Sequence, residues 1–220
     1  MGAIVPVKPL DSSSDHGLRG ARFYVALGFL FGIVGHHWAH ARVAIALGDR
    51  TPKLMGRATL KIKPHIDTLG SVIMPIVFVV VAVFRGPYGM MFGWGKSQSF
   101  NPRAFRKPKR DMILVALAGP AATALIAAIA AAISRAELHN NIGLVFGYIM
   151  LVNSFLTVVE LLPIPGRDGG RVLVRFLSPR AAMRFEELVQ YELIFLLVLF
   201  LFLESVVVHM TDSFRRLIGA

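Results

Sequence analysis

The amino-acid sequence predicts an all-α integral membrane protein. Hydrophobic residues make up 55% of the chain, only 17% of its residues are charged, and the mean hydropathy is +0.62. A soluble domain of 24.1 kDa cannot bury that much apolar surface, so we expect a lipid bilayer to cover the excess. Several apolar stretches also reach the ~20 residues that a membrane-spanning helix requires. The fold class follows from these two observations.

Four of the apolar stretches are long enough to cross a bilayer as helices. A fifth stretch, Gly70–Val83, is shorter and is followed by Arg85-Gly86-Pro87. This length is typical of a re-entrant or half-spanning segment. We therefore expect four long transmembrane helices and one short re-entrant segment. The predicted spans are Phe23–Leu47, Met112–Ile133, Ile142–Leu162 and Leu188–Val208.

The residues outside the spans suggest one domain with short tails. Residues Leu54–Ile62 alternate loosely between apolar and polar, and Pro64 ends this pattern, so we expect a small membrane-associated β element there. The first 21 residues are polar and Ser-rich and lack the apolar core of a cleaved signal peptide. The predicted organisation is a flexible tail (1–21), a single transmembrane domain (22–210) and a C-terminal tail (211–220). The first spanning helix is expected to serve as the export signal.

The basic residues indicate how the chain is oriented. Lys and Arg outnumber Asp and Glu by 24 to 13, and they lie in the connections between the apolar runs. This distribution indicates membrane orientation and argues against a nucleic-acid partner. The connections on both sides of Gly70–Val83, and the connection from Pro163 to Glu187, are rich in Lys and Arg. We expect all three on the cytoplasmic side and both ends of the chain on the opposite side.

Three histidines lie close together in the first predicted span. His36 and His40 are four residues apart, so they project from one face of a helix and can share one metal ion. Histidines inside a membrane helix are costly without compensation, which favours a metal-binding or proton-handling role over a polar lining of the helix bundle. The chain contains no cysteine, so a metal site must use histidine and carboxylate ligands.

Asp168 is the candidate for a third metal ligand. Catalytic zinc sites usually have three protein ligands and keep a fourth position open. Asp168 follows Pro163 and Pro165, which end a helix, and precedes Gly169 and Gly170, which permit a tight backbone. This setting can turn a carboxylate back toward the histidines. From the residues alone, Asp168 fits equally well as the N-cap of the following helix.

These motifs resemble those of the compact bacterial site-2 protease family, whose first core helix carries H-E-x-x-H. The resemblance covers the chain from about Gly35 to Leu173, in the order of the family. It implies an intramembrane zinc metallopeptidase in the bacterial inner membrane, with Zn²⁺ held by His36, His40 and Asp168 toward the cytoplasmic side. The further matching residues are Ala41, Gly48-Asp49, Gly56-Arg57, Thr59-Leu60, Pro64-His65-Ile66-Asp67, Gly70, Gly93-Trp94, Asn101-Pro102, Ala118-Gly119-Pro120, Leu162-Pro163-Ile164-Pro165 and Gly169-Gly170.

Two positions depart from the family's pattern. His37 stands where the family has the Glu that activates the attacking water, and Glu160 stands where the family usually has an Asn thought to hold substrate. Peptide hydrolysis still requires a group that accepts a proton and later returns it. Glu160 and His37 are therefore the candidate catalytic residues. Because the Glu of the motif is missing, the sequence leaves open whether the chain is an active enzyme.

Three hypotheses follow from these departures. Glu160 or His37 replaces the missing base of a peptidase that cleaves within or beside a transmembrane segment, where Leu54–Ile62 can pair with the unwound substrate. Alternatively, His37 becomes an additional ligand and makes the zinc structural. In the third hypothesis the metal is lost and the chain is a pseudoprotease, either a scaffold for a partner helix or a subunit of a larger membrane complex. Ion or proton transport is a further alternative. The expected partners are the bilayer and a transmembrane helix of a substrate or partner protein.

Overall fold

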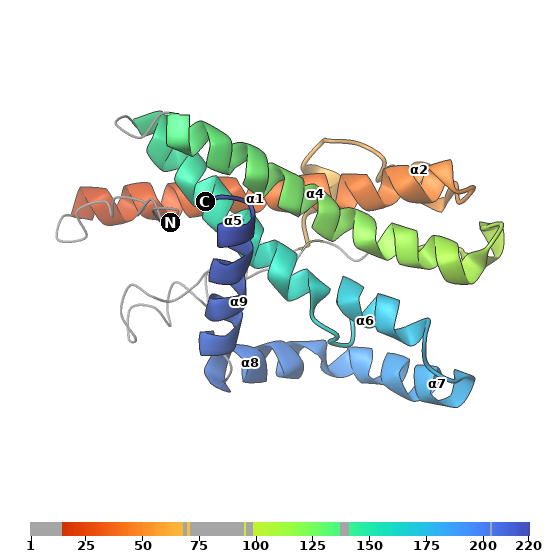
Figure 1. Cartoon of the computed structure of the whole chain (residues 1–220). Helices are drawn as coiled ribbons and strands as arrows, with labels where there is room; N and C mark the ends of the chain where they lie inside the picture. The colour runs from red at the N-terminus through yellow and green to blue at the C-terminus, as the bar shows by residue number, and fades with distance from the viewer. Residues whose placement is uncertain (1–14, 68–69, 71–94, 96–98, 137–140, 203) are drawn as a thin grey trace.

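The computed structural model describes residues 15–67, 70, 95, 99–136, 141–202 and 204–220, and these parts of the chain are mostly helical. Three long helices pack against one another: α1 (Asp15–Ala46), α4 (Pro108–Ala136) and α5 (Asn141–Leu161). Figure 1 shows α7 and α8 in a row beside this group, with α6 between that row and α4, and α9 running from the end of α8 back to α5. The shorter helices are α2 (Thr51–Leu54), α6 (Asp168–Val174), α7 (Pro179–Glu187), α8 (Glu192–Phe202) and α9 (Glu204–Leu217), with 3₁₀ turns at Lys63–His65, Pro102–Ala104 and Leu188–Tyr191.

Two of the described helices are long and apolar enough to cross a membrane, namely α4 and α5. They correspond to the predicted spans Met112–Ile133 and Ile142–Leu162, and they support the prediction of a membrane protein. The helix α1 includes the first predicted span, Phe23–Leu47, except its last residue, and the three histidines within that span lower its hydropathy. The described helices therefore confirm an all-α fold with two candidate spans, and the predicted number of four is not confirmed.

The predicted fourth span, Leu188–Val208, is not one helix. A 3₁₀ turn and α8 come first, and α9 then turns away from the direction of α8 (Figure 1). Leu196 of α8 and Val207 of α9 are both buried in one cluster with Phe155 and Val159 of α5. The chain must change direction to bring both helices onto α5, and a continuous apolar run does not reveal such a turn. The helix α9 continues to Leu217, so it includes most of the residues that the sequence predicted as a C-terminal tail.

The predicted β element at Leu54–Ile62 is not a strand. The helix α2 ends at Leu54, and Gly56 has a φ of 69°. The Gly56 N–H donates to the carbonyl of Lys53, and the Arg57 N–H donates to the carbonyl of Pro52, which is a Schellman cap. Bends then lead to the 3₁₀ turn at Lys63. The alternation of polar and apolar residues falls on the end of a helix and the bends after it. Such an alternation over a short stretch is therefore not specific to a strand.

The predicted β element was not replaced by a sheet elsewhere in the described residues. The described residues contain one isolated antiparallel bridge, between Ile66 and Gly95, and no sheet. The predicted re-entrant segment Gly70–Val83 lies outside the described residues, apart from Gly70 itself.

Close packing of α1 against α5 determines where the histidines of α1 lie. A Cβ atom on Gly28 would lie 3.1 Å from the Cα of Ile149, and one on Gly32 would lie 2.8 Å from Oδ1 of Asn153. Asn153 is fully buried, and its amide nitrogen donates to the carbonyls of Gly28 and Ile149. Small residues at a helix interface allow this close approach, and a buried amide then links the two helices.

Candidate metal centre

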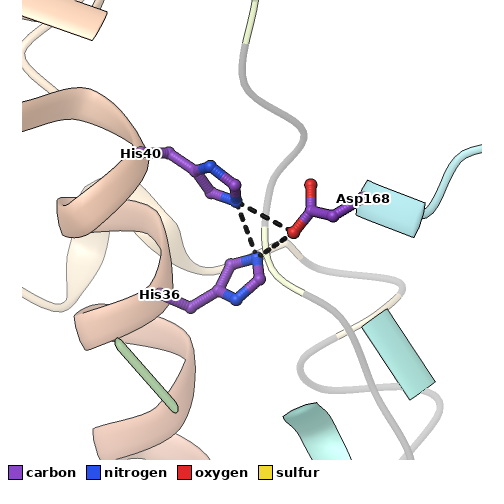
Figure 2. A group of neighbouring side chains, drawn as sticks. All are labelled: His36, His40 and Asp168. Atoms are coloured by element: carbon purple, nitrogen blue, oxygen red, sulfur yellow. Dashed lines mark hydrogen bonds and ion pairs between the residues drawn. The ribbon is translucent and has the colours of Figure 1, made fainter. Parts of the chain in front are cut away.

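Three side chains predicted as metal ligands meet in the interior of the protein. His36 and His40 project from one face of α1, and Asp168 reaches them from the start of α6, as Figure 2 shows. The Nε2 atoms of the two histidines are 3.0 Å apart. Oδ2 of Asp168 lies 3.1 Å from Nε2 of His36 and 3.0 Å from Nε2 of His40. All three residues are buried, so the predicted set forms one compact group.

The orientation of the His40 ring is determined by a backbone carbonyl of α4. The Nδ1–H of His40 donates to the carbonyl oxygen of Val115 at 2.6 Å. Because a carbonyl can only accept, the proton of a neutral His40 must lie on Nδ1. The Nε2 atom then presents its lone pair to the centre of the group. Such a hydrogen bond from the second nitrogen of a ligand histidine is common in metal sites.

The chemistry of these donor atoms fits a metal ion. The lone pair of His40 Nε2 and the carboxylate oxygen of Asp168 face each other at 3.0 Å, and His36 Nε2 lies equally close. Several electron-rich atoms at this separation require a cation between them, either a proton or a metal. Two histidines and one carboxylate are also a ligand set of catalytic zinc sites, in which a fourth position remains for water or substrate.

Asp168 is the first residue of α6, and Arg167 occupies the N-cap position. The side chain of Asp168 points to the histidines, which decides between the two roles that the sequence left open. Burial alone would raise the pKa of the Asp168 carboxyl, but the electrostatic interactions and hydrogen bonds with His40 and His36 hold this pKa well below its ordinary value. The other oxygen, Oδ1, lies 3.6 Å from the Arg171 guanidinium. These contacts favour the ionised form that binds a metal.

The two glycines after Asp168 allow α6 to start directly against the end of α5. A Cβ atom on Gly169 would lie 2.1 Å from the carbonyl oxygen of Leu161, and one on Gly170 would lie 2.1 Å from that of Ile164. Both obstacles are backbone atoms, which cannot move aside as a flexible side chain can. The tight backbone expected at Gly169-Gly170 is therefore present, and it brings Asp168 to the histidines.

Gly119 likewise allows close packing, here of α4 against the two histidine rings. A Cβ atom there would lie 2.3 Å from Nε2 of His40 and 2.5 Å from Cε1 of His36. Pro120, the next residue, has no N–H to donate within the helix. The Gly119-Pro120 pair thus marks the point where α4 passes the two imidazole rings. Only a residue without a side chain fits here while the histidines keep their positions.

A cavity of about 170 Å³ lies beside the metal-binding group. Both candidate catalytic residues, His37 and Glu160, line it, together with His36, His40 and Asp168. The structure therefore places all five predicted site residues around one space. The other lining residues are Gly32, Ile33, Asp67, Gly95, Thr123, Leu156, Gly166, Arg167, Arg171 and Glu192.

His37 lies next to the metal-binding group without belonging to it. The group of ligand atoms consists of His36, His40 and Asp168. The ring of His37 stacks on the ring of His65, with 5.8 Å between their centroids and 10° between their planes. His65 is in turn buried, and its Nε2–H donates to the carbonyl of Thr59 at 2.7 Å. Among the described residues, the geometry thus gives no support to His37 as a fourth ligand.

Glu160 has a cationic partner. Its Oε1 atom accepts a hydrogen bond from Nη1 of Arg167 at 2.7 Å. The other terminal nitrogen of Arg167, Nη2, is hydrogen-bonded to Oε1 of Glu192. A Glu near the membrane interior needs either a nearby cation or a proton-transfer role, and the structure supplies the cation. Whether Glu160 acts as a base stays a prediction.

Several contributors to the site were missed by sequence reasoning. The Val115 carbonyl carries no side-chain signal and is not recognisable before the helices are packed. Arg167 and Arg171 were assigned only to the basic connection, although Arg167 directly precedes Asp168 and Arg171 forms an ion pair with it one helical turn later. Glu192 had a signal, because it is one of only two charged residues, with Glu204, within the apolar stretch Leu188–Val208.

Comparison with known proteins gives relatives of one kind. The chain is 28% identical over 187 residues to "Putative zinc metalloprotease YwhC" of Bacillus subtilis, and the match covers 80% of each chain. It is also 28% identical over 187 residues to "Putative zinc metalloprotease Rip2" of Mycobacterium tuberculosis, covering 83% of this chain and 68% of the relative. A Rip2 protein of Mycolicibacterium smegmatis is 25% identical over 163 residues, covering 73% and 60%. No protein-family model and no solved structure matches the chain. The names of these relatives describe them as zinc metalloproteases. In this chain, His36, His40 and Asp168 form a group that can hold a metal ion.

Proposed function

We propose that this chain, a homologue of zinc metalloproteases of the site-2 protease family, is itself a zinc-dependent peptidase of the membrane. Its reaction is the hydrolysis of a peptide bond within or beside a transmembrane segment. The observation that carries the proposal is the convergence of His36, His40 and Asp168 beside a cavity. The two apolar helices α4 and α5, which place this group within the bundle, support its location in a membrane.

The ligand residues are prepared for a metal by their own contacts. Zinc, when bound, polarises a carbonyl and lowers the pKa of water. His40 holds its proton on Nδ1 against the Val115 carbonyl and keeps Nε2 available. Arg171 lies on the far oxygen of Asp168 and leaves Oδ2 directed at the histidines. Each ligand is thus oriented by a second contact, which is how metal sites fix ligand geometry.

For the base, the structure favours His37 over Glu160. His37 lies on the same turn of α1 as the two ligand histidines and lines the same cavity. A neutral imidazole accepts a proton from water and returns it to the leaving amine, so His37 can perform both transfers. The carboxylate of Glu160 is already hydrogen-bonded to Arg167, and accepting a proton would weaken that ion pair. Glu160 is therefore the weaker candidate for the transfer.

One observation favours a second candidate function. No carboxylate other than Asp168 belongs to the described metal-binding group, and His37 stands at the position of the family's Glu. If His37 does not transfer protons, the chain binds zinc and does not cleave. The site would then be that of a pseudoprotease whose cavity receives a partner helix, as a scaffold or as a subunit of a larger membrane complex.

Three measurements on the purified protein test the proposal. The wild type, purified in detergent without chelator, should contain one zinc ion per chain and should cleave a model single-pass membrane substrate. The His37→Ala variant should keep its zinc and lose ~10²–10⁴-fold in cleavage rate, the range for removing a general acid–base group. A matched control is His209→Ala, which removes an exposed histidine of α9 whose Nδ1 donates to the Ser205 carbonyl. This control should behave as the wild type.

The outcomes separate the two functions. Cleavage by the wild type that is lost in His37→Ala supports the peptidase. A zinc-loaded wild type that cleaves nothing, combined with cleavage by His37→Glu, would instead support the pseudoprotease with an intact groove. Absence of zinc from the wild type would refute the peptidase.

A further inference from the structure

A second charged cluster lies in the same cavity, next to the metal-binding group. The Arg167 guanidinium is held between two carboxylates, Glu160 on one side and Glu192 on the other. Its side chain is only 4% exposed, whereas those of Glu160 and Glu192 are 16% and 27% exposed. The three residues come from the end of α5, from the loop before α6 and from the start of α8. The cluster therefore joins three separate elements.

The backbone of Arg167 starts the helix that carries Asp168. The Arg167 N–H donates to the carbonyl of Ile164, and the Arg167 carbonyl accepts from the N–H of Arg171. The residue before it, Gly166, has a φ of 89°, and a Cβ atom there would lie 2.3 Å from Oε2 of Glu192. Backbone and side-chain contacts thus enclose the corner formed by residues 166 to 168.

We propose that Arg167 is a positioning residue for the metal site. The ion pairs with Glu160 and Glu192 hold this corner in place, so that Oδ2 of Asp168 stays within reach of His36 and His40. The inference deepens the proposed function and rests on it. It also gives Glu160 a role at the position where the family usually has Asn: Glu160 is the counter-ion of Arg167.

The electrostatics explain why all three charges are needed. A buried guanidinium without a partner is strongly unfavourable, and two carboxylates with no cation between them repel each other. Removing the Arg167 charge therefore leaves Glu160 and Glu192 free to separate, and with them the end of α5 and the start of α8. The corner between these elements loses its fixed position. Asp168, the next residue, then no longer meets the histidines in one arrangement.

The test compares zinc affinity in two arginine variants. Arg167→Gln should bind zinc ~10–100-fold more weakly than the wild type in competition with a chromogenic chelator, the range for losing a contact that orients a metal ligand. The control is Arg175→Gln, whose arginine pairs with Glu186 of α7 at 3.6 Å and does not line the cavity. Its zinc affinity should equal that of the wild type. Arg167→Lys keeps the charge and should recover part of the affinity.

Neutralising the carboxylates provides a milder version of the test. Glu192→Gln, at the more exposed side of the cluster, should lower zinc affinity less than Arg167→Gln does. The double variant Glu160→Gln with Glu192→Gln should lower zinc affinity almost as much as Arg167→Gln. A purely structural role predicts a lower melting temperature of the zinc-free protein with unchanged zinc affinity. That result, or equal affinities of Arg167→Gln and Arg175→Gln, would overturn the inference while the proposed function stands. If Arg167→Gln does not fold, the zinc affinity of Glu192→Gln, compared with that of Arg175→Gln, decides instead. A wild type that binds no zinc would refute both the proposed function and this inference.

Discussion

At the scale of single residues, the site depends on His40 having both ring nitrogens engaged. One nitrogen donates to the Val115 carbonyl, and the other faces His36 and Asp168. The helix α4 thus orients His40 through a backbone carbonyl. The same helix passes the His36 and His40 rings at Gly119, where a Cβ atom would overlap both rings.

The first prediction concerns the ligands. Substituting Ala for His36, His40 or Asp168 individually should abolish stoichiometric zinc, because two remaining protein ligands leave the ion short of the three that catalytic sites supply. Metal analysis by mass spectrometry of the purified variants, with circular dichroism to verify folding, measures the effect. Zinc retained at one ion per chain in Asp168→Ala would show that Asp168 is not a ligand.

The second prediction concerns Gly119. In Gly119→Ala the new methyl group would overlap the His36 and His40 rings, so we expect zinc binding to fall at least ~10-fold, as for other changes that disturb ligand orientation. The matched control is Gly35→Ala, in which the new Cβ would meet only the end of the flexible Ile126 side chain, at 2.7 Å. Both changes raise the helix propensity similarly. Zinc titration of the two variants should therefore separate them, and equal affinities would contradict the prediction.

At the scale of elements, buried polar residues connect the three long helices. Asn153 links α5 to α1, and the hydroxyls of Thr157 and Thr123 link α5 to α4 at 2.8 Å. Thr123 also lines the cavity. These contacts hold the scaffold on which the two histidines and the loop with Asp168 are mounted. The apolar contacts between the helices do not by themselves fix how far one helix can slide along another.

The third prediction follows from the link between α1 and α5. Asn153→Ala should reduce stability by ~0.5–2 kcal/mol, because the Gly28 carbonyl loses its partner on α5. The control is the neighbouring Ser154→Ala. Ser154 is equally buried, but among the described residues its hydroxyl has no hydrogen-bond partner, so its loss should cost less. Thermal unfolding of both variants in the same detergent measures the difference, and equal losses would argue against the link.

At the scale of the whole molecule, the basic segments lie near one end of the bundle. Oδ2 of Asp49 accepts a hydrogen bond from the Asn101 N–H at 2.8 Å, so the chain after α1 and the chain before α4 are joined. The segment before α4 and the first turn of α4 carry five exposed basic residues: Arg103, Arg106, Lys107, Lys109 and Arg110. Figure 1 shows α2 and the start of α4 at the same end as α7. A single surface rich in positive charge is expected on the cytoplasmic side.

The fourth prediction is therefore one of topology. Reporter fusions at Arg57, Lys107 and Arg180 should all give a cytoplasmic signal, because short loops with excess Lys and Arg remain on that side. A fusion at the C-terminal end serves as the comparison and should report the opposite side. A periplasmic signal at Lys107 alone would contradict both the joined loops and the predicted orientation.

The sequence by itself determined the chemical character of this protein. The excess of apolar residues indicated a membrane, and the four-residue spacing of His36 and His40 placed two imidazoles on one helix face, because the helix repeat is a local property. The broken-helix setting of Asp168 was also readable, since prolines and glycines act on the adjacent backbone. These features depend on neighbouring residues and are therefore visible without a fold.

Only the tertiary structure decided what depends on residues far apart in the chain. Asp168 and His40 are separated by 128 positions, and helix packing made Asp168 a partner of the histidines instead of an N-cap. Packing also divided the apolar run Leu188–Val208, because α8 and α9 both bury side chains against α5. It paired Glu160 with Arg167 and brought Glu192 to the same guanidinium. Such contacts form when separate helices pack against one another. The spacing of residues within a single helix does not specify them.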